Sequence, residues 1–317
     1  MPTGRIIKTG LTDLYDQRIK KAWSIGWEPQ DEGYADVYAL IDITTEDFRA
    51  SFVSGFGQWP RKEMGANVAF DSIYQGYDVT ITPATYALAF TIEKETWQDD
   101  PHGLLGQGLS RNLGQMGRYT EQVLAAAQFN TAFTATAVSP WMSGGDGQYF
   151  LDTDHPIQSG GTYANKPASD VDFSVTALQD SLLRLQKVQG PRGELQGLKG
   201  ELVVVSSDQV WLVREILGSP QLPYIETSTP NVAREGLKYK VWAHLTDSDT
   251  WFVRSKMAPM QDGRPTGPGA TTVCVWRQQP EFDRDNVFTS GDREYKGDMR
   301  LAYGRLDWRG WDGSAGG

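Results

Sequence analysis

Apolar residues at the start of the chain recur at helical spacing. In LTDLYDQRIKKAWS (residues 11–24), the leucines, Ile19 and Trp23 fall roughly on one face of a helix. The polar GWEPQDEGY that follows should end this helix, because it contains a glycine and a proline. The pattern predicts an N-terminal arm with one amphipathic helix.

Residues 46–95 have the alternation of extended chain. EDFRASFVSGFGQWPRKEMGANVAF (46–70) places alternating apolar positions around a middle containing glycine, proline and lysine, which indicates an extended projection. In YDVTITPATYALAFTIEKE (77–95), apolar residues alternate before and after a short turn at Pro83. We expect these two runs to pair as a ribbon. Long two-stranded ribbons are marginal alone and usually lie against another molecule or domain.

A long helix is predicted over DDPHGLLGQGLSRNLGQMGRYTEQVLAAAQFNTAF (99–133), where apolar residues return at helical intervals for about seven turns. Two aspartates and Pro101 are typical of a helix start. Its glycines each weaken a helix by about 1 kcal/mol relative to alanine. We therefore expect another element to pack close to the backbone at these glycines, because neither common phosphate-loop motif is present. They are Gly106, Gly108, Gly114 and Gly117.

The remainder alternates between helical and strand patterns, which predicts a second mixed α/β unit over about 134–265. FSVTALQDSLLRLQKVQG and SSDQVWLVREILGS have helical spacing, and ELVVVSS is typical of a buried strand. KYKVWAHL and TWFVRS alternate like two paired strands with TDSD as their turn. TTVCVWRQQPEF and DREYKGDMRLAYGRLDWRGW return to strand patterns near the C-terminus.

The composition is that of a globular protein with an acidic balance. Hydrophobic residues make up 39% and charged residues 22% of 317 residues, and the net charge is −10. A chain this acidic has no overall basic footprint for tight nucleic-acid binding, so any contact with DNA should be loose. The sequence has no apolar run of about 18 residues, and we expect a soluble, intracellular protein with no membrane contact. The single cysteine, Cys274, is expected in a buried strand.

The stretch DTDHPIQSGGTYANK (152–166) is the best candidate for chemistry. His155 lies within three positions of Asp152 and Asp154, a combination that could hold a metal ion or serve as an acid/base pair. The sequence contains no HExxH, no GxSxG and no pair of CxxC motifs to support such a site. No catalytic residue, metal ligand or cofactor is predicted from the residues.

The same stretch has what a structured loop needs. Aspartate and asparagine side chains bond nearby backbone amides, Pro156 fixes its own φ, and Gly160 and Gly161 permit positive φ. We prefer this structural interpretation to a metal site, because no second cluster of ligands accompanies His155.

Three stretches resemble the Mu-like major head subunit group of tailed-bacteriophage major capsid proteins, which have the Hong Kong 97-type fold. YALAFTIEKETWQDDPHGLLGQ is similar to a strand followed by the acidic start of the group's spine helix. EFDRDNVFTSGDREYKGDMRLAYGRLDWRG is similar to its closing strands. YFLDTDHPIQSGGTYANK resembles its HP…GG…N loop, carried by His155, Pro156, Gly160, Gly161 and Asn165.

The resemblance implies an α+β fold with an N-terminal arm, an extended β-hairpin loop, a peripheral domain with a long spine helix, and an axial domain. It assigns the signature loop a structural role and places four residues of the extended loop at subunit contacts: Trp59, Pro60, Arg61 and Lys62. The implied segments are the arm at 1–45, the extended loop at 46–98, the spine helix at 99–133, the axial domain at 134–270 and peripheral-domain strands at 271–317.

The resemblance further implies a structural protein, not an enzyme, that self-assembles into the pentamers and hexamers of an icosahedral shell. The shell would enclose double-stranded DNA that it contacts non-specifically, with a separate scaffolding protein, a portal and cement proteins as further partners. Assembly would take place in the host cytoplasm, and the protein would end in the virion. A projecting ribbon and a glycine-rich long helix suit such a subunit, because closed shells are built from repeated contacts between neighbours. Two alternatives are an encapsulin-like compartment and a metal-dependent hydrolase centred on Asp152, Asp154 and His155.

Overall fold

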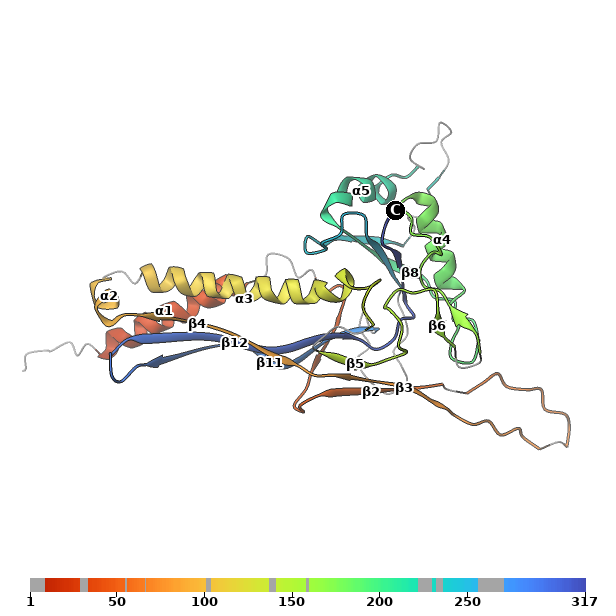
Figure 1. The fold of residues 1–317 in the computed structure, drawn as a ribbon, viewed down its shortest axis with the longest axis horizontal. Helices are drawn as coiled ribbons and strands as arrows, with labels where there is room; N and C mark the ends of the chain where they lie inside the picture. Colours follow the sequence, from red (N-terminus) through yellow and green to blue (C-terminus); the bar gives the residue numbers. More distant parts are fainter. Residues whose placement is uncertain are drawn as a thin grey trace, which may run out of the picture. The chain divides into compact units, whose positions relative to one another are not determined.

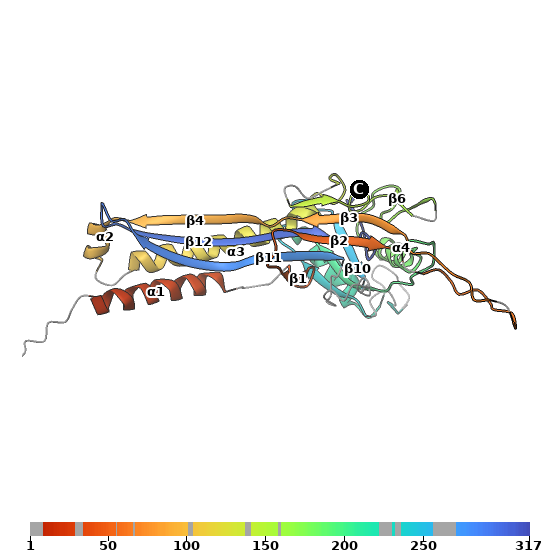
Figure 2. The ribbon, with the colours of Figure 1, turned by 90° about the horizontal axis from the view of Figure 1, so that it is seen from below.

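The computed structural model shows an α+β protein (Figures 1 and 2). It describes residues 9–28, 34–54, 56–65, 67–100, 104–136, 141–157, 160–221, 230–231, 236–255 and 271–317. The chain divides into two compact units. The first unit comprises Met1–Glu32, Pro83–Leu124 and Trp276–Leu301, and the second comprises Gly33–Thr82, Ala125–Val275 and Ala302–Gly317.

The first unit contains α1 (Thr9–Trp27), α2 (Lys94–Asp99), most of α3 (Leu104–Asn130) and β4 (Ala84–Ile92). Its β4 pairs antiparallel with β12 (Arg293–Arg305), in a sheet ordered β1-β11-β12-β4. In that sheet, β1 (Ala39–Asp42), the first residues of β11 (Thr272–Asn286) and the last residues of β12 are assigned to the second unit. The helices predicted over 11–24 and 99–133 are confirmed as α1 and α3. Apolar side chains close the core of this unit at Ile19, Ile92 and Tyr295.

The predicted close packing at the glycines of α3 is confirmed where α1 lies against it. A Cβ added at Gly114 would lie 2.5 Å from the backbone oxygen of Trp23, and one at Gly117 would clash with the Trp27 ring. The Ser110 hydroxyl donates to the backbone oxygen of Ile19 at 2.9 Å, which joins the same two helices. These contacts require a backbone that carries no side chain. The docking of α1 therefore offsets the destabilising effect of the glycines on the helix.

The second unit is built around a sheet ordered β13-β10-β8-β9, which packs against α4 (Val175–Gln186) and α5 (Val210–Gly218), the latter preceded by the short helix η1 (Ser207–Gln209). The sheet strands are β8 (Gly200–Val205), β9 (Lys238–Val241), β10 (Trp251–Ser255) and β13 (Trp311–Ser314). The predicted pairing of KYKVWAHL with TWFVRS is wrong, because β9 and β10 lie on opposite sides of β8. The apolar run of β8 is buried, which suits a central strand with neighbours on both edges.

A second sheet of this unit, ordered β2-β3-β5, corrects the predicted ribbon. It consists of β2 (Phe48–Val53), β3 (Gln75–Ile81) and β5 (Met142–Gly144). The expected pairing of residues 77–81 with 86–92 is wrong: β3 pairs with β2, with Phe48 opposite Ile81, whereas β4 pairs with β12. Alternation identifies a strand but not its partner, and the chain passes from one unit to the other between Thr82 and Pro83. The projecting ribbon is therefore formed by β2, β3 and the segment between them (Figure 2).

Candidate functional site

The signature loop of the second unit folds as a tight hairpin. Its short strands, β6 (His155–Pro156) and β7 (Thr162–Tyr163), pair antiparallel. Gly160 and Gly161 have φ of 99° and 91°, so the predicted need for positive φ is confirmed at both positions. Residues other than glycine rarely adopt this backbone conformation, which explains why both positions of the turn are glycine.

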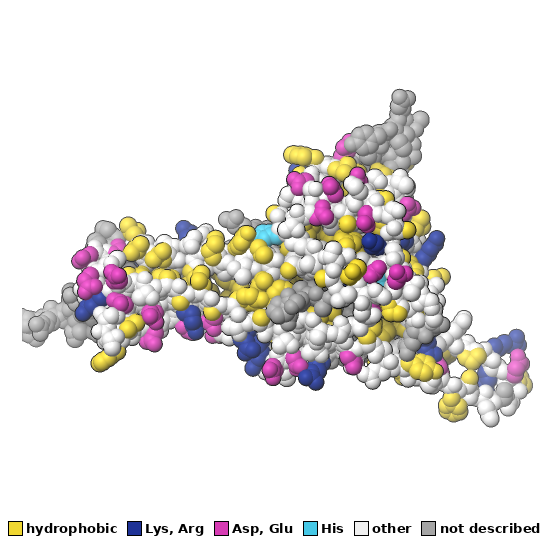
Figure 3. Space-filling model, in the orientation of Figure 1, with side chains coloured by type: hydrophobic (Ala, Val, Ile, Leu, Met, Phe, Trp, Pro, Cys, Tyr) yellow, Lys and Arg dark blue, Asp and Glu magenta, His cyan; other side chains and the backbone are white. Residues whose placement is uncertain are grey.

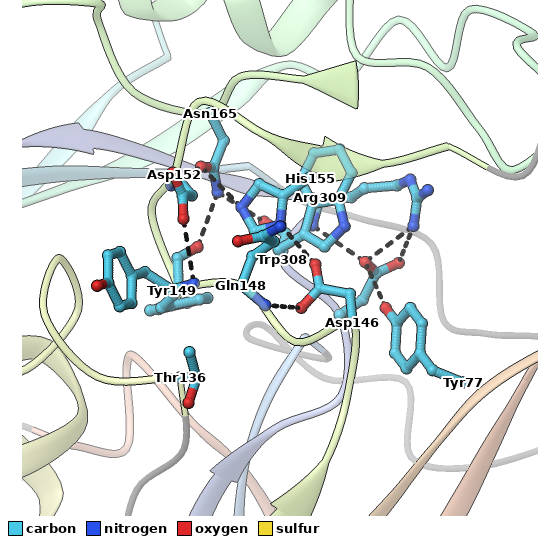
Figure 4. A network of polar contacts seen from close by, with 12 residues as sticks. Tyr77, Thr136, Asp146, Gln148, Tyr149, Asp152, His155, Asn165, Trp308 and Arg309 are labelled. Atoms are coloured by element: carbon cyan, nitrogen blue, oxygen red, sulfur yellow. Dashed lines mark hydrogen bonds and ion pairs between the residues drawn. The ribbon is translucent and has the colours of Figure 1, made fainter. Parts of the chain in front are cut away.

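Asn165 is the centre of a buried hydrogen-bond network (Figure 4). Its side-chain oxygen accepts from the Asp152 amide at 2.8 Å, and its side-chain nitrogen donates to the backbone oxygens of Phe150 at 3.0 Å and Trp308 at 3.5 Å. Its backbone oxygen accepts from the Gly313 amide at 3.3 Å. One side chain therefore links the loop to the closing segment of the chain, 143 residues further along the sequence.

His155 lies fully buried beside Asn165. Its Nδ1 is 2.5 Å from the Asp146 carboxylate, and its Nε2 is 3.1 Å from the side-chain oxygen of Asn165. The ring stacks on Trp308 with centroids 4.3 Å apart and planes 10° apart. The ring donates to both oxygens only when each nitrogen carries a proton. With an oxygen within hydrogen-bond distance of each nitrogen and one face covered by Trp308, the imidazole is positioned as a packing element (Figure 4).

The carboxylates beside His155 in sequence accept hydrogen bonds from neighbouring residues of the chain. The Asp152 carboxylate accepts from the amides of Thr153 at 2.7 Å and Tyr149 at 3.3 Å, and Asp154 accepts from the Thr153 hydroxyl at 3.3 Å. The imidazole instead contacts Asp146, which the sequence reasoning missed; the only signal was its place in the glycine-rich SGGDG. Among the residues that the structure describes, no three histidine, cysteine or acidic side chains gather as metal ligands would. The geometry therefore does not favour the hydrolase alternative.

A second buried network lies next to this one and reaches the base of the ribbon. Asp307 accepts from Arg309 at 3.0 Å and from the Tyr77 hydroxyl at 3.3 Å, so the end of β3 is bonded to the C-terminal segment (Figure 4). Burial, and then the Asp307 charge, raise the pKa of Tyr77 well above its usual value. Burial also lowers the pKa of Arg305 to about 10, while its guanidinium donates to two backbone oxygens. These buried ions hold loops in place.

An ion pair joins α4 to β13. Arg184 donates to both oxygens of Asp312, at 2.8 and 2.7 Å, while its backbone oxygen accepts from the Tyr163 hydroxyl at 2.6 Å. Burial raises the pKa of Asp312 to about 6, against the opposing effect of Arg184. The paired geometry satisfies the carboxylate, but its desolvation leaves it easily protonated.

The ribbon carries exposed apolar side chains beside basic ones at its tip (Figure 3). Trp59 is 92% exposed and Phe70 is 98% exposed, and Arg61 and Lys62 are exposed next to Pro60. Such exposure of large apolar residues on a projecting element is typical of an interaction surface.

A polar contact holds the ribbon against the loop after α4. The Asp71 carboxylate accepts from the Gly57 amide at 2.7 Å, from the Ser72 amide at 2.8 Å and from Arg192 at 2.7 Å. These contacts, the Gly57 amide foremost, lower the pKa of Asp71. The Arg192 guanidinium also donates to the backbone oxygen of Ser72 and lies over the Tyr74 ring. We call Asp71 and Arg192 the ribbon latch.

A phage capsid protein family model matches residues 76–311, which is most of the chain. The chain belongs to this phage capsid protein family. No curated protein matches the sequence. Across the described residues, no helix is both long and apolar enough to cross a bilayer.

Solved capsid structures share the fold at low identity. A chain of the bacteriophage JBD30 capsid decorated with minor capsid protein trimers is 14% identical, with a TM-score of 0.53, and the match covers 76% of this chain and all of that one. The bacteriophage PhiM1 mature capsid gives 11% identity and a TM-score of 0.52, covering 89% of this chain and 85% of that one.

A virus-like particle from Pyrococcus furiosus gives 10% identity and a TM-score of 0.50, covering 95% of this chain and 99% of that one. Another JBD30 capsid chain is longer, and this chain spans 65% of it. The predicted Hong Kong 97-type capsid fold is confirmed, whereas the Mu-like subgroup remains a prediction.

Proposed function

We propose that the chain is the major structural subunit of an icosahedral phage head, assembling as pentamers and hexamers around double-stranded DNA. The observation that carries the proposal is the ribbon tip on a chain of the phage capsid family. Trp59, Phe70 and the 103%-exposed Met64 find little cover within their own subunit. Burying side chains of this size stabilises a contact by roughly 1.5–3 kcal/mol each, which a neighbouring subunit can supply.

The ribbon would reach its neighbour through Trp59, Pro60, Arg61 and Lys62, while the latch orients the ribbon from its own subunit. The signature loop of His155, Pro156, Gly160, Gly161 and Asn165 would keep the second unit rigid. We retain the implied segments as proposals. They are the N-terminal arm at 1–45, the extended loop at 46–98, the spine helix at 99–133, the axial domain at 134–270 and the peripheral-domain strands at 271–317.

Further proposals concern the partners and the life cycle. They are a separate scaffolding protein, a portal, cement proteins and assembly in the host cytoplasm. The family match supports the phage head over the encapsulin-like compartment, and a nucleic-acid assay of native particles separates the two, because a compartment shell would hold protein cargo instead of DNA.

Electron microscopy of the protein from its native source, or co-expressed with a candidate scaffold, tests the proposal. We expect uniform icosahedral particles or rings of five and six subunits. Trp59→Ala should reduce shell formation without shifting the unfolding midpoint. Trp211→Ala is the matched control, because Trp211 is 74% exposed on α5, away from the ribbon. Monomers under every assembly condition, with scaffold included, would contradict the proposal.

A further inference from the structure

A groove runs between α1 and α3 in the first unit, the two helices drawn in red and yellow in Figure 1. It has a volume of about 470 Å³. Each helix contributes residues at positions i, i+3, i+4 and i+7, which is one face of a helix. The lining residues are Arg18, Lys21, Ala22 and Ile25 from α1, and Leu104, Gln107, Gly108 and Arg111 from α3.

The side chains that line the groove are cationic. Arg18, Lys21 and Arg111 line it, and among the residues whose side chains the structure describes, no acidic residue lines it and none forms an ion pair with these three. The protein as a whole carries a charge of −10, and other basic side chains, such as Arg184 and Arg192, are paired with carboxylates. Three like charges around one groove repel each other, and an anion placed between them would relieve that repulsion.

Gly108 keeps the groove open on the side of α3. A glycine inside a helix destabilises it relative to alanine. At Gly114 and Gly117 the cost is offset because α1 contacts the bare backbone, but a Cβ at Gly108 would meet nothing within 4 Å. We expected another element to pack close to the backbone at these glycines, and no described residue of the chain does so at Gly108. Its missing side chain leaves open space in the groove.

We propose that this groove binds the sugar–phosphate backbone of nucleic acid, an inference that rests on the proposed role as a DNA-enclosing shell. Arg18 and Lys21 are three residues apart, which is about 4.5 Å of helix rise, a scale similar to the spacing of about 3.4 Å between successive phosphates of one strand along the duplex axis. A repeating anion can thus meet several cations at once. Contacts to phosphates carry no sequence information, so binding is loose and non-specific.

The test measures binding of the full-length subunit, before assembly, to a short labelled duplex by fluorescence anisotropy over a series of KCl concentrations. Three phosphate contacts give a slope of log affinity against log salt of about −3. Replacing Arg18, Lys21 or Arg111 singly by glutamine should reduce the slope by about 1. Lys20→Gln is the matched control, because it removes the same charge from α1 outside the groove and should leave the slope unchanged.

Gly108→Ala separates a binding role from a structural one. It should raise the unfolding midpoint, because alanine favours the helix, yet weaken DNA binding by filling the open space. The inference is overturned if Lys20→Gln and Lys21→Gln weaken binding equally, since the attraction is then diffuse. It is also overturned if the groove variants bind DNA normally but form fewer shells, since the groove then holds an acidic segment of another subunit. Shell formation by the wild-type protein tests the proposed function separately.

Discussion

Replacing Asn165 by alanine should destabilise the second unit severely. The change removes the acceptor of the half-buried Asp152 amide and the donor to the buried Phe150 backbone oxygen. Leaving a buried polar group unpaired costs about 1–3 kcal/mol, so the two together cost about 2–6 kcal/mol. This approaches the total stability of an ordinary domain, which is about 5–15 kcal/mol.

Asp152→Asn is the matched control, because its side chain keeps one carbonyl oxygen to accept from the Thr153 amide. We expect a loss below about 1 kcal/mol. A chain of two units need not unfold in one step, so amide hydrogen exchange over residues 146–165 and near Gly313 should accompany chemical denaturation. If the loop were instead a metal site with Asp152 as a ligand, Asp152→Asn would be the more damaging of the two variants. A stable Asn165→Ala protein, or a larger loss in Asp152→Asn, would refute the structural role of the loop.

Three further outcomes are expected. Gly114→Ala should weaken the docking of α1, because its Cβ would meet the Trp23 backbone oxygen at 2.5 Å; faster hydrogen exchange in α1 would show it, and unchanged exchange would contradict it. Arg192→Ala should speed exchange of the Gly57 amide, since Asp71 loses the partner that orients its carboxylate. The pKa of Asp312 is about 6 against an ordinary 3.8, so the folded state binds more protons between these values. The free energy of unfolding should therefore fall by up to about 3 kcal/mol between pH 4 and 6, and Asp312→Asn should abolish that part of the slope in urea titrations across this range.

Periodicity predicted the elements of this protein better than their partners. The helices α1, α3 and α4 follow from apolar spacing, and the N-cap of α4 is Ser174, whose side chain accepts from the Ala177 amide. Strand pairing failed twice, at β3 with β4 and at β9 with β10. Both errors have one physical cause: alternation reports which face of a strand is buried, whereas pairing depends on contacts between residues far apart in sequence.

In the candidate site, too, contacts between sequence neighbours could be predicted, whereas contacts between residues far apart in sequence could not. Positive φ at Gly160 and Gly161 and the Asp152 contacts with neighbouring amides are local, and the sequence was sufficient for them. The partners of His155 could not be found that way. Asp146 lies in a glycine-rich loop and Trp308 near the end of the chain, and only the folded second unit brings both to the imidazole.

The second unit satisfies its buried charges internally and leaves its apolar surplus at the ribbon tip. Arg184 pairs with Asp312 and Arg309 with Asp307, so folding this unit requires no neighbouring subunit to neutralise these ions. Trp59, by contrast, has almost no cover from its own chain. A subunit arranged in this way can fold first and assemble afterwards, because these two buried ion pairs are complete before assembly buries the apolar surface of the ribbon. If that order holds, variants of the ribbon tip stop assembly at folded subunits, whereas variants of Asn165 stop it earlier, at the folding of the unit itself.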